Sequence, residues 1–135
     1  ILSDGDTSKL YFNTRSTVDL TAPKTGVMSG LLFFSNSENA TMTKAASAKV
    51  LIQGHVIRSD NARRLVGTVY LPDDKLVIDG NSPVADKSEY TVIIAKAFQL
   101  NNGPNLVLQT DYDASDIPVP DGVGPMKESS VRLLQ

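Results

Sequence analysis

The sequence predicts an all-β domain, and three observations lead to that fold class. β-Branched and aromatic residues gather in short runs, each closed by Asn, Asp, Gly, Ser or Pro. Some runs alternate apolar and polar residues, so that Val18 and Leu20 share one face of Thr17–Thr21. Stretches with helical periodicity are scarce. We therefore expect short strands joined by frequent turns.

The expected strands follow these runs in chain order. They are Lys9–Phe12, Ser16–Thr21, Gly30–Ser35, Val50–Arg58, Leu65–Leu71, Lys75–Ile78, Thr91–Leu100, Asn105–Thr110 and Val131–Leu134. Three segments differ from the strand pattern. Glu38–Ser47 is interpreted as a loop or a brief helical turn, and Ser59–Arg64 as a turn whose Ser or Asp bonds the following amides. Asp111–Ser130, rich in Asp, Pro and Gly, is expected to form an extended strap before the last strand.

Two architectures fit this strand list. Pairs of strands recur at intervals of roughly 20 to 30 residues, which is typical of the coils of a parallel β-solenoid. A β-sandwich with hairpin connections fits nearly as well. Asn and Asp at the expected corners, such as Asp79, Asn81 and Asn102, favour the solenoid slightly because these side chains bond turn backbone. The fold class predicted here is a short right-handed parallel β-helix, with the β-sandwich as the alternative.

Composition limits the class of protein. A chain of 135 residues suits a single β-solenoid-like domain over residues 1–135. Its formal net charge is -2, with charges spread along the chain, so a nucleic-acid partner is not expected. The absence of cysteine excludes disulfides and thiolate metal sites. No apolar run is long enough for a membrane-spanning helix. Because the chain begins at Ile1 and no signal-peptide pattern precedes it, we expect a fragment that lacks its own N-terminus, and any membrane anchor would lie in the missing part.

No catalytic or cofactor-binding residues are expected. His55 is the one histidine, so a histidine pair for zinc cannot form and a catalytic triad would depend on this residue alone. Its strand-like neighbours favour a solvent-facing or hydrogen-bonded structural histidine. The sequence contains neither a Gly-x-Ser-x-Gly elbow nor a Gly-rich phosphate loop. We therefore expect no enzymatic activity.

Two clusters of charged residues are candidate binding sites. Asp111, Asp113 and Asp116 offer closely spaced carboxylates of the kind that calcium prefers, although the central glycine and late glutamate of an EF-hand are missing. A solvated Asp-rich turn is the competing interpretation. Asp60, Arg63 and Arg64 form the one close group of acid and base, which suits either a surface ion pair or the lining of a carbohydrate-binding groove.

The order of several motifs resembles the C-terminal region of TadG-like proteins, from the TadE/TadG group of the tight-adherence (Flp) pilus system. The stretches that carry the resemblance are Ser16–Gly26 (STVDLTAPKTG), Gly30–Ser35 (GLLFFS), Leu65–Pro72 (LVGTVYLP), Leu76–Asn81 (LVIDGN) and Tyr90–Lys96 (YTVIIAK). It covers most of the chain. The resemblance implies that the chain is the C-terminal fragment of a larger bacterial envelope protein, held on the periplasmic or extracellular side by a transmembrane segment in the missing N-terminal part. It offers no catalytic residues to transfer.

Two functions are therefore expected from the sequence. The first is a non-enzymatic structural or interaction module that binds protein partners of the envelope or of the pilus machinery and contributes to adherence. The alternative is a carbohydrate-binding or carbohydrate-active β-helix, in which Asp60, Arg63, Arg64 or the acids from Asp111 to Asp116 line a groove for a polysaccharide.

Overall fold

The computed structural model describes residues 2–3, 9–35 and 54–124, and the prediction of an all-β domain is confirmed for these residues. The strands are β1 (Leu2–Ser3), β2 (Tyr11–Phe12), β3 (Thr17–Thr21), β4 (Leu31–Ser35), β5 (His55–Ile57), β6 (Asn61–Asp79) and β7 (Thr91–Asn101). The helical content of the described ranges is one short 3-10 helix, Tyr112–Ala114.

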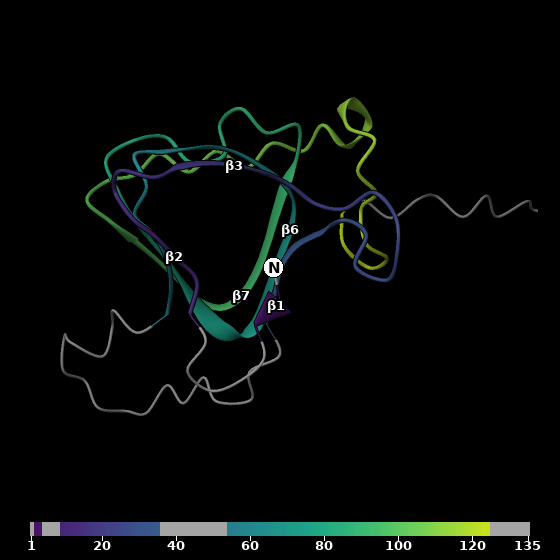
Figure 1. Ribbon diagram of the computed structural model, residues 1–135, viewed down its shortest axis with the longest axis horizontal. Helices are drawn as coiled ribbons and strands as arrows, with labels where there is room; N and C mark the ends of the chain where they lie inside the picture. Colours follow the sequence, from purple (N-terminus) through teal and green to yellow (C-terminus); the bar gives the residue numbers. More distant parts are fainter. Residues whose placement is uncertain (1, 4–8, 36–53, 125–135) are drawn as a thin grey trace, which may run out of the picture.

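The strands form a curled sheet in which every ladder among the described residues is parallel. β6 is central: β3, β4 and β5 pair with successive parts of it, and β7 pairs along its other edge. Seen down its shortest axis, the chain traces a triangular outline (Figure 1). A hairpin-connected β-sandwich is not compatible with these ladders, because strands joined by hairpins pair antiparallel.

Contacts between neighbouring layers of the curled sheet recur at similar sequence separations. The partners Arg58 and Asp79 lie 21 positions apart, and the partners Arg63 and Asp86 lie 23 positions apart. The parallel register also places like side chains above one another, as with Ile57 and Ile78. Similar residues therefore form columns across the layers.

The hydrophobic core is a single cluster of buried side chains. Its centre is formed by fully buried aliphatic residues such as Val66, Val69, Leu71, Leu76 and Ile78. Burial of one such side chain contributes about 1.5–3 kcal/mol relative to exposure. Because these residues come from one long strand, β6 alone supplies much of the packing that holds its neighbours in place.

Several predicted boundaries differ from the structure. Leu65–Leu71 and Lys75–Ile78 belong to one strand, β6, with a shift of register against β7 between Leu71 and Lys75. Ser59–Arg64 is not a turn, because β6 begins at Asn61; the Ser59 hydroxyl nevertheless accepts the Asn61 N–H at 3.0 Å.

The segment predicted as the strand Asn105–Thr110 makes only isolated bridges, Val84 to Leu106 and Tyr90 to Thr110. Glu38–Ser47, Val131–Leu134 and the first part of Val50–Arg58 lie outside the described residues.

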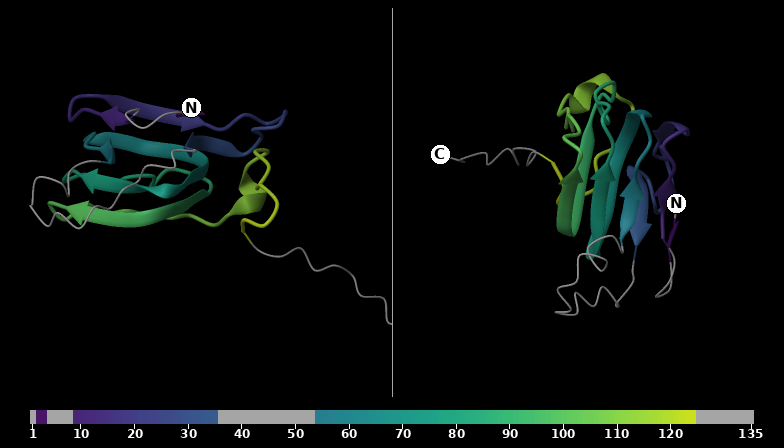
Figure 2. Two further views of the ribbon diagram at one scale, coloured as in Figure 1. Left: turned by 90° about the horizontal axis from the view of Figure 1, so that it is seen from below. Right: turned by 90° about the vertical axis from the view of Figure 1, so that its left-hand side faces the viewer.

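The C-terminal segment, residues 111–124, packs against the loop that precedes β4 (Figure 2). The Tyr90 hydroxyl donates a hydrogen bond to the Pro118 carbonyl at 2.9 Å, and the rings of Tyr90 and Tyr112 lie 5.3 Å apart. Lys24 forms an ion pair with Asp116. The described part of the expected strap, residues 111–124, is therefore fixed to two segments that are distant in sequence, and residues 125–130 lie outside the described residues.

Tyr90 makes the stability of the fold sensitive to alkaline pH. The side chain is fully buried, and desolvation, with a smaller contribution from Tyr112, raises the pKa of Tyr90 to about 12 from 10.0. The unfolded chain releases this proton near pH 10, whereas the folded chain retains it until about pH 12. The stabilisation is therefore complete below pH 10 and is lost as the pH rises through the folded pKa.

We expect Tyr90→Phe to reduce the pH dependence of stability between pH 10 and 12, because the titrating group is gone. At pH 7 the variant loses about 1 kcal/mol, since the Pro118 carbonyl loses its donor. Urea unfolding followed by circular dichroism across this pH range measures both effects. Tyr11→Phe is the control, because Tyr11 is 54% exposed. If the free energy of unfolding fell equally steeply between pH 10 and 12 in the wild type and in Tyr90→Phe, Tyr90 would not be the group responsible for the pH dependence.

Gly67 is required where β6 passes the loop before β4. Its φ is +132°, and a Cβ at this position would lie 2.6 Å from the Ala22 Cβ. Gly26 has a φ of +92°, but its Cβ would meet no atom of the described residues within 4 Å.

Gly67→Ala should therefore destabilise the protein by about 2–4 kcal/mol, and Gly26→Ala by about 1 kcal/mol, because only the first adds overlap to backbone strain. Urea unfolding midpoints check the difference between the two variants. Equal losses of stability would show that the contact with Ala22 carries no cost.

Candidate functional site

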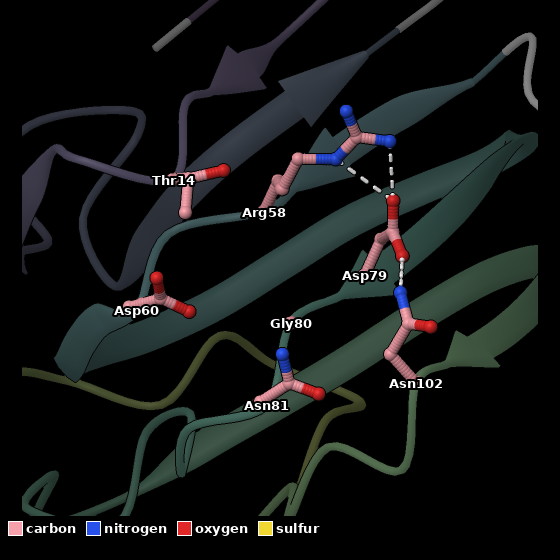
Figure 3. A pocket seen from close by; sticks show the side chains of 7 residues that line it. All are labelled: Thr14, Arg58, Asp60, Asp79, Gly80, Asn81 and Asn102. Atoms are coloured by element: carbon pink, nitrogen blue, oxygen red, sulfur yellow. Dashed lines mark hydrogen bonds and ion pairs between the residues drawn. The ribbon is translucent and has the colours of Figure 1, made fainter.

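A depression of about 210 Å³ opens at one corner of the curled sheet (Figure 3). Its lining is almost entirely polar and comes from segments far apart in the sequence: Thr14, Arg58, Asp60, Asp79, Gly80, Asn81 and Asn102. We refer to these seven residues as the corner pocket.

The parallel register brings the pocket together. Arg58 follows β5, Asp79 ends β6 and Asn102 follows β7, and the last residues of these strands are in register, as in the pairs Ile57 with Ile78 and Asp79 with Asn101. Residues just beyond the strand ends must therefore lie at the same corner of neighbouring layers.

Backbone hydrogen bonds fix the first side of the corner pocket. The Arg58 N–H donates to the Phe12 carbonyl at 2.9 Å, and the Asp60 N–H donates to the Thr14 carbonyl at 3.2 Å. Asn102 has a φ of +63°, a left-handed conformation that Asn tolerates better than most residues. The backbone on both sides of the pocket is thus held by the sheet.

One half of the pocket is an ordered polar ladder. The Arg58 Nε donates to the Asp79 Oδ2 at 2.8 Å, and the Asn102 amide donates to the Asp79 Oδ1 at 2.6 Å. Figure 3 shows the three side chains in line. The hydrogen bond and charge of Asp79 raise the pKa of Arg58. Both Asp79 oxygens are therefore engaged, and this half of the pocket is preorganised.

The other half presents polar groups that remain available. Within the described residues, the side chains of Thr14, Asp60 and Asn81 make no hydrogen bond or ion pair, and all three are exposed. Figure 3 shows them around the same opening, opposite the Arg58–Asp79 pair. A hydroxyl, a carboxylate and an amide can thus bind a ligand without first losing an internal partner.

The charged residues predicted as a cluster are not brought together. Asp60 lies in the corner pocket, whereas Arg63 pairs with Asp86, and Arg64 bonds the Glu89 carboxylate at 3.0 Å. The hydrogen bond from Arg63 lowers the pKa of Asp86. The structure therefore does not bring Asp60, Arg63 and Arg64 together in one pocket, because both arginines bond acids from the next layer of the sheet.

The calcium candidates Asp111, Asp113 and Asp116 lie in and around the 3-10 helix Tyr112–Ala114. Asp116 is engaged by Lys24, whose hydrogen bond lowers the pKa of the Asp116 carboxyl. Among residues 2–3, 9–35 and 54–124, no group of three or more His, Asp or Glu side chains is placed to hold a metal ion.

His55 is held by hydrogen bonds at both ring nitrogens. It is only 4% exposed; its Nδ1 accepts the Leu10 N–H at 3.1 Å, and its Nε2 lies 3.1 Å from the Asp74 Oδ2. The expectation of a hydrogen-bonded histidine agrees with this geometry. The contacts join the segment before β2 to β6, so the residue is a structural connector.

Sequence reasoning identified Asp60 but not most of its companions in the pocket. Asp79, Asn81 and Asn102 were recognised only as corner residues, and Thr14 and Arg58 were not singled out. The pattern that could have identified these pocket residues is the recurrence of Asn and Asp directly after successive strands. To predict from this pattern that the residues share one pocket, one must know the register between the strands. The sequence does not specify that register across the segment between β4 and β5.

Comparison with known proteins finds no matching family model, no similar curated protein and no similar solved structure. Among the described residues, no helix has the length and apolar character needed to cross a membrane.

The hydrogen bonds of His55 predict a single neutral tautomer. Because Nδ1 accepts a backbone N–H, the proton must sit on Nε2, where it is donated to Asp74. Long-range 1H–15N correlation spectra at pH 8 should show Nε2 protonated, and assignment is direct because the chain has one histidine. In Asp74→Asn the same tautomer should persist, since the Leu10 contact is unchanged. A protonated Nδ1 in the wild type would contradict this geometry.

Proposed function

We propose that the domain is a short right-handed parallel β-helix that serves as a non-enzymatic structural or interaction module of a bacterial cell-envelope protein, with a role in tight-adherence pilus assembly. The β-helix gives it a rigid frame. The corner pocket and neighbouring outward-facing side chains form the surface offered to a partner.

Parallel pairing supports the β-helix. β6 pairs on one side with β3, β4 and β5 and on the other with β7, with aliphatic residues aligned between layers. In such a fold each coil buries its apolar face only by stacking on its neighbours. The single cluster of buried apolar side chains fits this arrangement.

The observation that carries the structural role is the set of ion pairs that link one layer to the next. Arg58 pairs with Asp79, Arg63 with Asp86, and Arg64 with both Asp19 and Glu89. Each such exposed pair adds little stability, but together they hold side chains of neighbouring layers in one arrangement. Their placement between layers supports a structural role more directly than a role in acid–base catalysis.

The envelope location and the link to the pilus system are based on the motif resemblance, which runs through the strands now seen as β3, β4, β6 and β7. Protein partners in the pilus machinery are the occupants that this resemblance favours.

Replacement of the domain in the producing cell tests the proposed function. A strain in which residues 9–124 are replaced by an unrelated folded domain of similar size should assemble fewer pili and lose most of its surface adherence. The control strain carries Asp111→Ala and Asp113→Ala, two exposed side chains outside the pocket. Normal piliation and adherence in the replacement strain, with wild-type protein levels, would overturn the proposal.

A further inference from the structure

We propose that the corner pocket binds a neutral saccharide, with the Asp60 carboxylate accepting hydrogen bonds from the sugar hydroxyls. This inference rests on the proposed interaction function and names a ligand class for the same surface.

The available groups match the chemistry of a hydroxyl-rich ligand. Asp60 is an acceptor, Asn81 offers both donor and acceptor, and the Thr14 hydroxyl can do either. Hydrogen bonds from hydroxyls to an ionised carboxylate are among the stronger ones. Since these three side chains have no partner among the described residues, a sugar gains their bonds without displacing internal ones.

The charge of the pocket selects against acidic sugars. Arg58 and Asp79 form an ion pair and offset each other, so Asp60 leaves a net negative charge at the opening. A ligand carboxylate or phosphate would face the unpaired Asp60 carboxylate and be repelled. A neutral sugar meets no such repulsion.

Tyr11 adds an apolar surface beside the polar groups. Its side chain is 54% exposed, and the Arg58 Nη1 lies 3.4 Å from its hydroxyl, so the Tyr11 hydroxyl adjoins the arginine that lines the pocket. The apolar face of a sugar ring can pack on such an aromatic side chain while its hydroxyls reach the acceptors.

The layout of the acceptors favours a chain of sugars over a single one. Thr14 precedes β3, Asp60 precedes β6, and Asn81 follows β6, so they occupy successive layers of the sheet. Neighbouring strands lie about 4.8 Å apart, so the groups follow the stacking direction. An oligosaccharide running along that direction meets more of them than a monosaccharide does.

Titration of the purified chain with uncharged gluco-, manno- and galacto-oligosaccharides tests the inference, with oligogalacturonate as the acidic probe. We expect chemical-shift changes at Asp60, Asn81 and Tyr11 for at least one neutral series. Oligogalacturonate should bind at least about tenfold more weakly than that series, a difference of about 1.4 kcal/mol.

Two variants of Asp60 separate its hydrogen bonding from its charge. Asp60→Ala should weaken the affinity for the neutral oligosaccharide by about tenfold or more, because the acceptor is lost. Asp60→Asn should reduce the ratio of the affinity for neutral sugar to that for acidic sugar, because the negative charge is removed. Asp121→Asn, which changes an exposed acid outside the pocket and outside the other candidate sites, should behave as wild type. Unchanged circular dichroism in all three variants shows that the fold is intact.

The inference would be overturned if no neutral oligosaccharide series changed the chemical shifts at a concentration of about 20 mM. This concentration is high enough to detect binding with a Kd in the millimolar range. Tighter binding of oligogalacturonate, or neutral binding that survives Asp60→Ala, would also overturn the inference. Loss of adherence in the domain-replacement strain together with no sugar binding would retain the interaction function and remove the saccharide as its ligand.

Discussion

The parallel register of β6 with its neighbours is the constraint on which the rest of the structure depends. Because β6 is paired along both edges, it fixes the position and the register of β3, β4 and β5 on one side and of β7 on the other. A slip of one residue would exchange the two faces of β6 and break the alignment of like residues between layers, such as Ile57 with Ile78. The buried sequence from Leu65 to Val69, followed by Leu76 to Ile78, makes such a slip costly.

The same register explains why the polar surface is ordered. Side chains that leave the sheet at equivalent positions meet their counterparts from the next layer, which yields the ion pairs of Arg58, Arg63 and Arg64 and the ladder from Arg58 to Asn102. Each exposed pair adds little stability by itself. Together they hold Arg58, Asp79 and Asn102 in one arrangement, so this half of the corner pocket is preorganised.

The sequence predicted the strand content well and the site only in part, for physical reasons. Alternation in Thr17–Thr21 and the apolar runs of β4 and β7 report local burial, so those strands were found. Ser59–Arg64 was misread because its polar residues resemble turn formers, whereas pairing with β3 makes most of it strand. The pairing of Arg63 with Asp86 depends on contacts 23 positions apart, which local patterns do not reveal.

The C-terminal segment has a consequence for how the molecule comes apart. Arrays of stacked units tend to fray from their ends, because a terminal unit has only one neighbour. Here the Pro118 backbone touches both Gly30, just before β4, and Tyr90, just before β7, and so it fastens the two sides of β6 together. Separation of the first layer therefore requires loss of these Pro118 contacts as well as of the ladders that join β3 and β4 to β6.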